Sequence, residues 1–99
     1  MTISFQYVKF EESAALSAAT RDQLDRLNAK YPWLIRAQVF FKVGNTSEQE
    51  NAICEIELSA PGPRLFASSK EVHFEAAMKE TVSDLDRQLN KRNQAFKAH

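Results

Sequence analysis

The hydrophobic period of the chain switches between two residues and about 3.6 residues, and the order of these switches restricts the possible folds. Residues 2–10 alternate apolar and polar side chains, which predicts a strand. Residues 14–30 carry apolar side chains at helical spacing, preceded by Ser13, a favourable N-cap residue, and followed by Pro32, which cannot extend a helix. The chain therefore begins with a strand and then a helix.

Three further strands are predicted in the middle of the chain, where alternation returns. They cover residues 34–43, 51–60 and 65–68. Gly44 and the segment Pro61-Gly62-Pro63 provide turn signals between them, so these strands should pair as antiparallel hairpins.

Alternation also assigns side chains to the two faces of the sheet. Cys54 should face the core with its apolar neighbours two residues apart, whereas Glu55 and Glu57 should face water. On the strand at 34–43, one face should be buried: Ile35, Ala37, Val39, Phe41 and Val43. The other face of that strand should be wet, with Phe40 exposed among polar residues: Arg36, Gln38 and Lys42.

The last predicted element is a long helix over residues 71–98. Its apolar side chains form one stripe: Phe74, Met78, Val82, Leu85, Leu89 and Phe96. The order β-α-β-β-β-α predicts an α+β fold, a four-stranded mixed sheet with two helices packed on one face. A chain of 99 residues suits one domain, so a single domain is expected over residues 1–99.

The net charge is zero, but its distribution is uneven. Residues 1–86 hold nine basic and 13 acidic residues, whereas residues 87–99 hold four basic residues and no acid: Arg87, Lys91, Arg92 and Lys97. A neutral total argues against a generally basic nucleic-acid binder. A local cationic feature still attracts anions.

Catalytic chemistry finds little support in the sequence. Cys54 is the single cysteine and is expected to be a buried, inert side chain. His73 is expected at the surface near a helix start, and His99 is the last residue. Glu55 and Glu57 on a wet face are expected to be solvated charges. We therefore expect no catalytic residues, no metal, no cofactor and no small-molecule substrate, which means that the protein is not an enzyme.

The expected compartment follows from what the sequence contains. Its longest apolar runs are a few residues, such as Val39-Phe40-Phe41, so no membrane partner is expected. The N-terminal residues have no basic segment followed by an apolar stretch, which argues against a signal peptide. One cysteine cannot form an internal disulfide, and a cytoplasmic location is expected.

Basic side chains on both helices are the candidate binding residues. Lys79, Arg87 and Lys91 should lie along one stripe of the last helix, and Arg92 and Lys97 extend it. Two simpler explanations of these basic residues stay open. The carboxyl end of a helix attracts cations, and Arg26 follows Asp22 by four residues and can form an ion pair with it within the helix. Alternatively, the two helices form one cationic surface for RNA phosphates, to which the first helix contributes Arg26 and Lys30.

The whole chain resembles a known family. The element order, the strand AQVFFKV, the segment GPRLFASS and above all HFEAAMKETVSDLDRQLNKRNQAFKAH are similar to the short ribosome hibernation promoting factors. This family includes the ribosome-associated inhibitor protein Y and was once labelled sigma-54 modulation protein. The most specific piece is the aromatic-x-Ala-Ala start at Phe74, followed by Arg87-Gln88-Leu89 and Lys91.

The resemblance implies a non-enzymatic factor that silences translation during starvation or other stress. Such factors bind the small ribosomal subunit and its rRNA, and occupy the channel where messenger and transfer RNA would lie. The matching RNA-binding positions here are Arg26, Lys42, Arg87, Lys91 and Lys97, with Lys30, Lys79 and Arg92 as neighbours.

This sequence also departs from the family pattern. Residues without positive charge stand where lysines are common: Gln23, Asp84, Asn93 and Ala95. Each lost phosphate contact weakens RNA binding. The alternative is therefore a divergent protein-binding or weakly homodimerising domain of the same fold, with an interface around Phe40 on the wet sheet face.

Overall fold

The computed structural model describes residues 1–45 and 50–97 and has the predicted order of elements. The predicted turn residues 46–49 and His99 lie outside the described part of the chain. The elements are β1 (Thr2–Val8), α1 (Ala14–Lys30), β2 (Arg36–Asn45), β3 (Glu50–Ser59), β4 (Leu65–Glu71) and α2 (Phe74–Lys97).

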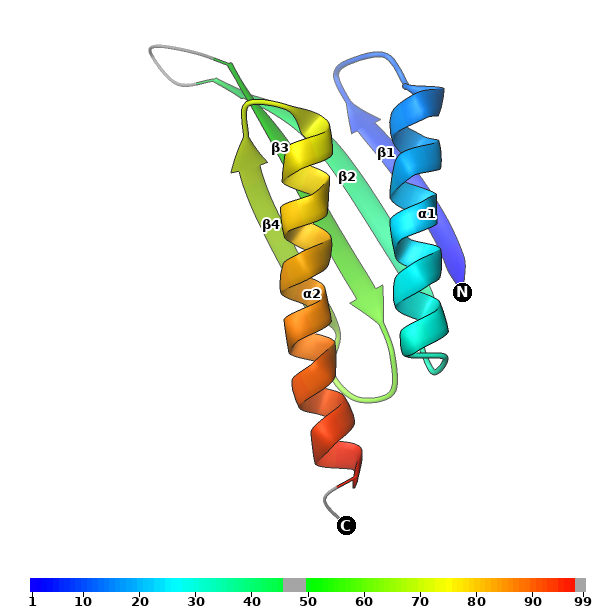
Figure 1. Cartoon of the computed structure of the whole chain (residues 1–99). Coiled ribbons are helices and arrows are strands. Elements are labelled where there is room, and N and C mark those ends of the chain that lie inside the picture. The colour runs from blue at the N-terminus through cyan, green and yellow to red at the C-terminus, as the bar shows by residue number, and fades with distance from the viewer. Residues whose placement is uncertain (46–49, 98–99) are drawn as a thin grey trace.

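The four strands form one mixed sheet in the order β1-β2-β3-β4. β1 pairs with β2 in parallel, because α1 carries the chain back to the start of the sheet, while the β2–β3 and β3–β4 pairs are antiparallel. Both helices lie side by side on one face of the sheet, and the other face is uncovered (Figure 1). The predicted α+β fold is confirmed.

The core lies between the helices and the sheet. Leu85 and Leu89 of α2 and Ile56 and Leu58 of β3 are all 0% exposed and belong to one cluster, as the alternation and the helical stripe predicted. Cys54 lies in the same cluster. Burial of this joint apolar surface is the main force that holds α2 on the sheet.

Several element boundaries differ from the prediction. β2 spans Arg36–Asn45 in place of 34–43, and β3 spans Glu50–Ser59 in place of 51–60. β1 ends at Val8 because Lys9 adopts a φ of 66°, a left-handed conformation that turns the chain. Phe10 therefore leaves the strand and stacks on Phe74 with ring centroids 4.9 Å apart. β4 continues to Glu71, where it still pairs with β3, so α2 begins at Phe74 and not at residue 71. The sequence did not predict the continuation of β4, because its last residues are all polar and do not alternate with apolar ones.

Three apolar side chains predicted to be buried are in fact exposed. Ile35 is 58% exposed because it precedes β2, and Val43 is 42% exposed at the far end of the sheet. Phe96 is 46% exposed because α2 continues beyond the sheet. The predicted exposure of Phe40 is also corrected: it is half-buried, and Phe66 of β4, at 53%, is the exposed aromatic on the open face.

Candidate nucleic-acid interface

The topology brings six chain segments together at one end of the molecule. β1, β2 and β4 begin there, and α1, β3 and α2 end there. Thr2 pairs with Arg36, and Arg36 with Ser59, so these positions lie at one level of the sheet. Figure 1 shows α2 extending past the sheet at this end, where both chain termini also lie.

Basic residues collect at this end from four of the segments. We call the set the basic end: Lys30, Arg36, Arg64, Arg87, Lys91, Arg92 and Lys97. The same segments, residues 1–4, 28–38, 57–66 and 84–97, contain three acids, Glu57, Asp84 and Asp86. The opposite end has the reverse balance, with Glu11, Glu12, Glu71, Glu75 and Glu80 near its turns. The molecule is thus electrically polarised along the helices although its net charge is zero.

On the helical side, Arg87 and Lys91 project from the solvent-facing surface of α2. Arg87 is held close to its own helix, because its guanidinium donates to Ser83 Oγ at 3.3 Å and lies 3.4 Å from Asp84 Oδ1. None of the ion pairs within the described part of the chain involves Lys91. The Arg87 pair is exposed, so a phosphate can displace Asp84 at small cost.

The turn between β3 and β4 lies against α2. Arg92 donates to the carbonyl oxygen of Pro61 at 3.4 Å, and a Cβ built on Gly62 would lie 3.7 Å from the Arg92 guanidinium carbon. Gly62 has a φ of 96°, which favours glycine. Arg64, at the end of this turn, pairs with Glu57 Oε1 at 2.8 Å on the open-face side. Arg92 is therefore partly engaged in fixing the turn.

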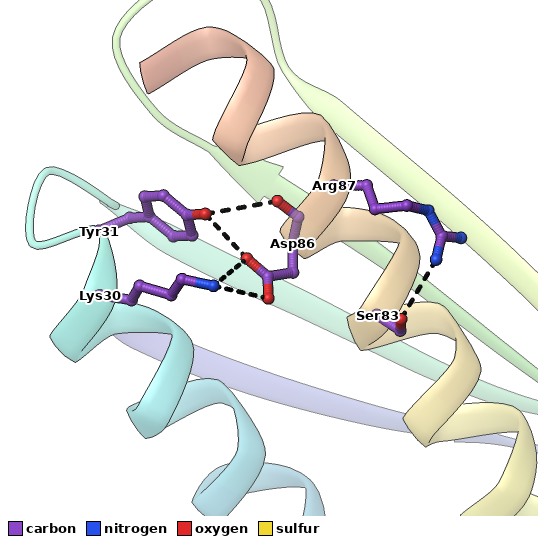
Figure 2. Close-up of polar contacts among 5 residues, drawn as sticks. All are labelled: Lys30, Tyr31, Ser83, Asp86 and Arg87. Atoms are coloured by element: carbon purple, nitrogen blue, oxygen red, sulfur yellow. Dashed lines mark hydrogen bonds and ion pairs between the residues drawn. The ribbon is translucent and has the colours of Figure 1, made fainter. Parts of the chain in front are cut away.

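A carboxylate on α2 joins the two helices (Figure 2). Both oxygens of Asp86 lie 3.0 Å from Lys30 Nζ, and Asp86 Oδ1 accepts a 2.8 Å hydrogen bond from the Tyr31 hydroxyl. The hydrogen bond from Lys30 to Asp86 raises the pKa of the Lys30 ammonium, and burial raises the pKa of Tyr31. The Lys30 ammonium is therefore charged at neutral pH, and the Tyr31 hydroxyl is neutral.

The remaining predicted binding residues lie elsewhere. Arg26 pairs with Asp22 at 3.2 Å on α1, which confirms the predicted intrahelical pair. Lys42 lies on the open sheet face and pairs with Glu55 at 2.6 Å. Lys79 lies at the opposite end of α2, paired with Glu75 at 3.3 Å and about 12 Å along the helix axis from Arg87.

Two residues of the basic end, Arg36 and Arg64, were not among the candidates from the sequence. They are isolated charges near strand ends, and no local pattern marks them. The hairpin register could have found them, because it places the start of β2 and the β3–β4 turn at the same end as the carboxyl end of α2.

Other chemistry is not assembled in the described residues. Burial raises the pKa of the Cys54 thiol to about 12, so its nucleophilic thiolate is absent near neutral pH. Within the described residues, 1–45 and 50–97, no three His, Cys, Asp or Glu side chains form a group that could hold a metal ion. Neither described helix combines the length and apolarity needed to cross a bilayer.

Comparison with known proteins identifies the family. The model of the sigma 54 modulation protein / S30EA ribosomal protein family matches residues 3–97. The chain belongs to this family. No curated protein sequence matches the chain significantly. For this S30EA family member, the family match covers both helices and, except for Thr2, all four strands.

Solved structures show the same fold in two proteins. A ribosomal subunit interface protein from Coxiella burnetii has a TM-score of 0.85 at 18% identity, over 95% of this chain and 99% of that chain. The Protein Y N-terminal domain of Thermus thermophilus has a TM-score of 0.79 at 22% identity, over 92% and 98%. At this identity the similarity establishes the fold of the S30EA chain.

Proposed function

We propose that this protein binds the ribosome and silences translation by occupying the RNA channel of the small subunit. Family membership supports a ribosome partner, as does the fold shared with a ribosomal subunit interface protein. The single observation that carries the choice of surface is the basic end, where seven basic side chains meet three acids. The proposed ligand of this end is the phosphate backbone of folded rRNA.

The proposed mechanism needs no chemical step. Lysine and arginine side chains neutralise phosphates and release counterions, which supplies affinity without reading a base sequence. The helices and the β3–β4 turn hold these side chains on a rigid frame, so little conformational entropy is lost on binding. A bound domain then prevents messenger and transfer RNA from entering the same space. The partner is the small subunit with its rRNA, and the site of action is the cytoplasm.

Charge reversal at the basic end tests the proposal. Arg87→Glu with Lys91→Glu should abolish co-sedimentation with the small subunit, because phosphate contacts are lost and repulsion replaces them. The fold should survive, since both side chains are exposed. The matched control is Lys9→Glu with Lys70→Glu, the same charge change at the opposite end, which should bind like the parent protein.

Two results would contradict the proposal. One is a reversed Arg87/Lys91 variant that still co-sediments like the parent at low salt. The other is equal loss in the Lys9/Lys70 control, which would mean that total charge and not the basic end governs binding. Circular dichroism and urea unfolding of both variants show whether the fold is intact.

A second candidate is a domain that pairs through the open sheet face. The observation that favours it is the aromatic Phe66, 53% exposed on that face, with half-buried Phe40 two strands away. An apolar interface changes little with salt, whereas RNA binding weakens steeply. Sedimentation equilibrium of the isolated protein between low and high salt separates the two candidates, because dimers that persist at high salt support the sheet-face interface.

A further inference from the structure

Asp86 is an acidic side chain placed within a basic surface. Figure 2 shows Lys30, the last residue of α1, and Tyr31, which follows it, pointing toward Asp86, while Arg87 points away on another side of α2. Its side chain is 36% exposed, and that of Lys30 is 59% exposed. Solvent, and a ligand of the helical surface, can therefore reach both groups.

Asp86 cannot easily turn away from this position. Tyr31 is 2% exposed, and its hydroxyl donates to Asp86 Oδ1 at 2.8 Å. The buried ring fixes the hydroxyl, and the hydroxyl in turn fixes the carboxylate. Lys30 is less constrained, because its long side chain ends in an exposed ammonium. This ammonium donates to both Asp86 carboxylate oxygens and lies 5.5 Å from the centroid of the Tyr31 ring.

The pair lies beside a shallow groove between the helices, of about 140 Å³. The groove is lined by Gln23, Arg26, Leu27, Lys30, Val82 and Asp86. Two cations on α1, of which Arg26 is already paired with Asp22, thus face one carboxylate on α2. A phosphate that approaches the groove is attracted by Arg26 and Lys30 but repelled by Asp86, and it must compete with Asp86 for the Lys30 ammonium.

We propose that Asp86 is an internal competitor for phosphate that limits the strength of anion binding at the basic end. In the free protein Asp86 holds Lys30. A phosphate can take Lys30 only by displacing Asp86, which Tyr31 keeps in place, so Asp86 withholds the Lys30 contact from phosphate in the parent protein. The inference rests on the proposed function and adds a residue that sets its affinity.

The test is Asp86→Asn, which removes the charge but keeps a side-chain oxygen to accept from Tyr31. Lys30 then becomes a free phosphate contact. At low salt the variant should bind small subunits about fivefold more tightly than the parent, the effect of roughly one exposed charge pair. Its plot of log affinity against log salt should be steeper by about 0.7–0.9, the slope of one added phosphate contact.

Asp25→Asn is the matched control. It changes the net charge by the same amount on α1, and no ion pair within the described residues involves Asp25. It should leave the salt slope unchanged. An equal gain in affinity and slope for both variants would overturn the inference, because general charge and not release of Lys30 would then be responsible.

A double-mutant cycle with Lys30→Gln tests the route of the effect. If Asp86 acts mainly through Lys30, Asp86→Asn should leave the salt slope unchanged in the Lys30→Gln background and should raise affinity much less than in the parent. A full gain in that background would overturn the inference. Urea unfolding of each variant shows that the helices remain packed.

Two further readouts separate this inference from the proposed function. Binding to polyuridylate, a simple polyanion, tests competition at Lys30 without a ribosome. Nuclear magnetic resonance titration of Lys30 Nζ should show a lower pKa in Asp86→Asn, because the charged partner is gone. If the parent protein does not bind ribosomes, the proposed function fails. If polyuridylate affinity and slope are equal in parent and Asp86→Asn, the competition fails.

Discussion

At the scale of single residues, burial decides what Cys54 can do. Its side chain is 0% exposed, and burial raises the pKa of the thiol from its ordinary value of 9.0 to about 12. Thr81, equally buried, donates to the carbonyl oxygens of Cys54 and Ala77 and so satisfies its own hydroxyl. The alternation of β3 predicted an inward, inert cysteine, and the structure confirms this position.

Alkaline unfolding tests the state of Cys54. In the unfolded chain the thiol ionises near pH 9.0, whereas the folded protein holds the proton until about pH 12. The stabilisation is complete below pH 9 and is lost as pH rises through this window, by about 1 kcal/mol per pH unit. Urea unfolding of Cys54→Ala should lack this component of the slope.

The comparison of the parent protein with Cys54→Ala isolates the contribution of Cys54. Lys30 and Tyr31 also have raised pKa values, but they lower the alkaline stability of both proteins alike. Equal slopes in parent and Cys54→Ala would contradict the assigned burial. A thiol reagent should likewise label the native parent protein only at the rate of unfolding.

At the scale of elements, α2 has two parts with different support. Over the sheet, the face of α2 toward β3 is fully buried, with Met78, Leu85 and Leu89 all 0% exposed. Beyond the sheet, its last turns depend on edge contacts: the Phe96 ring lies 5.2 Å from that of Trp33, and Arg92 bonds to the β3–β4 turn. Three members of the basic end, Lys91, Arg92 and Lys97, lie on the less supported part.

Leu85→Ala measures the support over the sheet. Loss of a fully buried leucine leaves a cavity, and we expect the free energy of unfolding to fall by about 2–5 kcal/mol. Urea unfolding gives the value. Asn90→Ala on the exposed side of the same helix should change it by less than about 0.5 kcal/mol. A loss below about 1 kcal/mol for Leu85→Ala would show that the helix face is misassigned.

Phe96→Ala measures the support beyond the sheet. The ring is 46% exposed, so global stability should fall by less than about 1 kcal/mol. Amide hydrogens of residues 91–97 should nevertheless exchange faster, because the last turns lose their aromatic contact and fray. Unchanged exchange rates in this segment would show that Trp33 does not hold the helix end.

At the scale of the whole molecule, the charge distribution follows the topology. Arg36 and Arg64 come from β2 and the β3–β4 turn, yet they lie at the same end as the carboxyl end of α2. They approach it from the open-face side, whereas Lys30 and Arg87 lie on the helical side. A ligand that envelops this end would meet positive charge from both faces.

Arg36→Gln with Arg64→Gln tests whether the open-face side takes part. If both side chains contact phosphates, affinity for small subunits should fall severalfold at low salt, and the salt slope should decrease by about 1.5. Lys9→Gln with Lys70→Gln at the opposite end is the control and should leave the slope unchanged. An unchanged slope for the arginine variant would confine the interface to the helical side.

The sequence alone determined the element order, the sheet faces and the apolar stripe of α2, because these depend on periodicity within one segment. It marked Arg87 and Lys91 through a local run of charge without acids. Tertiary structure decided which charges meet: it added Arg36 and Arg64 to the basic end, paired Lys42 with Glu55, and brought Asp86 to Lys30 across 56 residues of sequence. Electrostatic partners depend on distance in space, and no local pattern encodes the packing that brings α1 and α2 together.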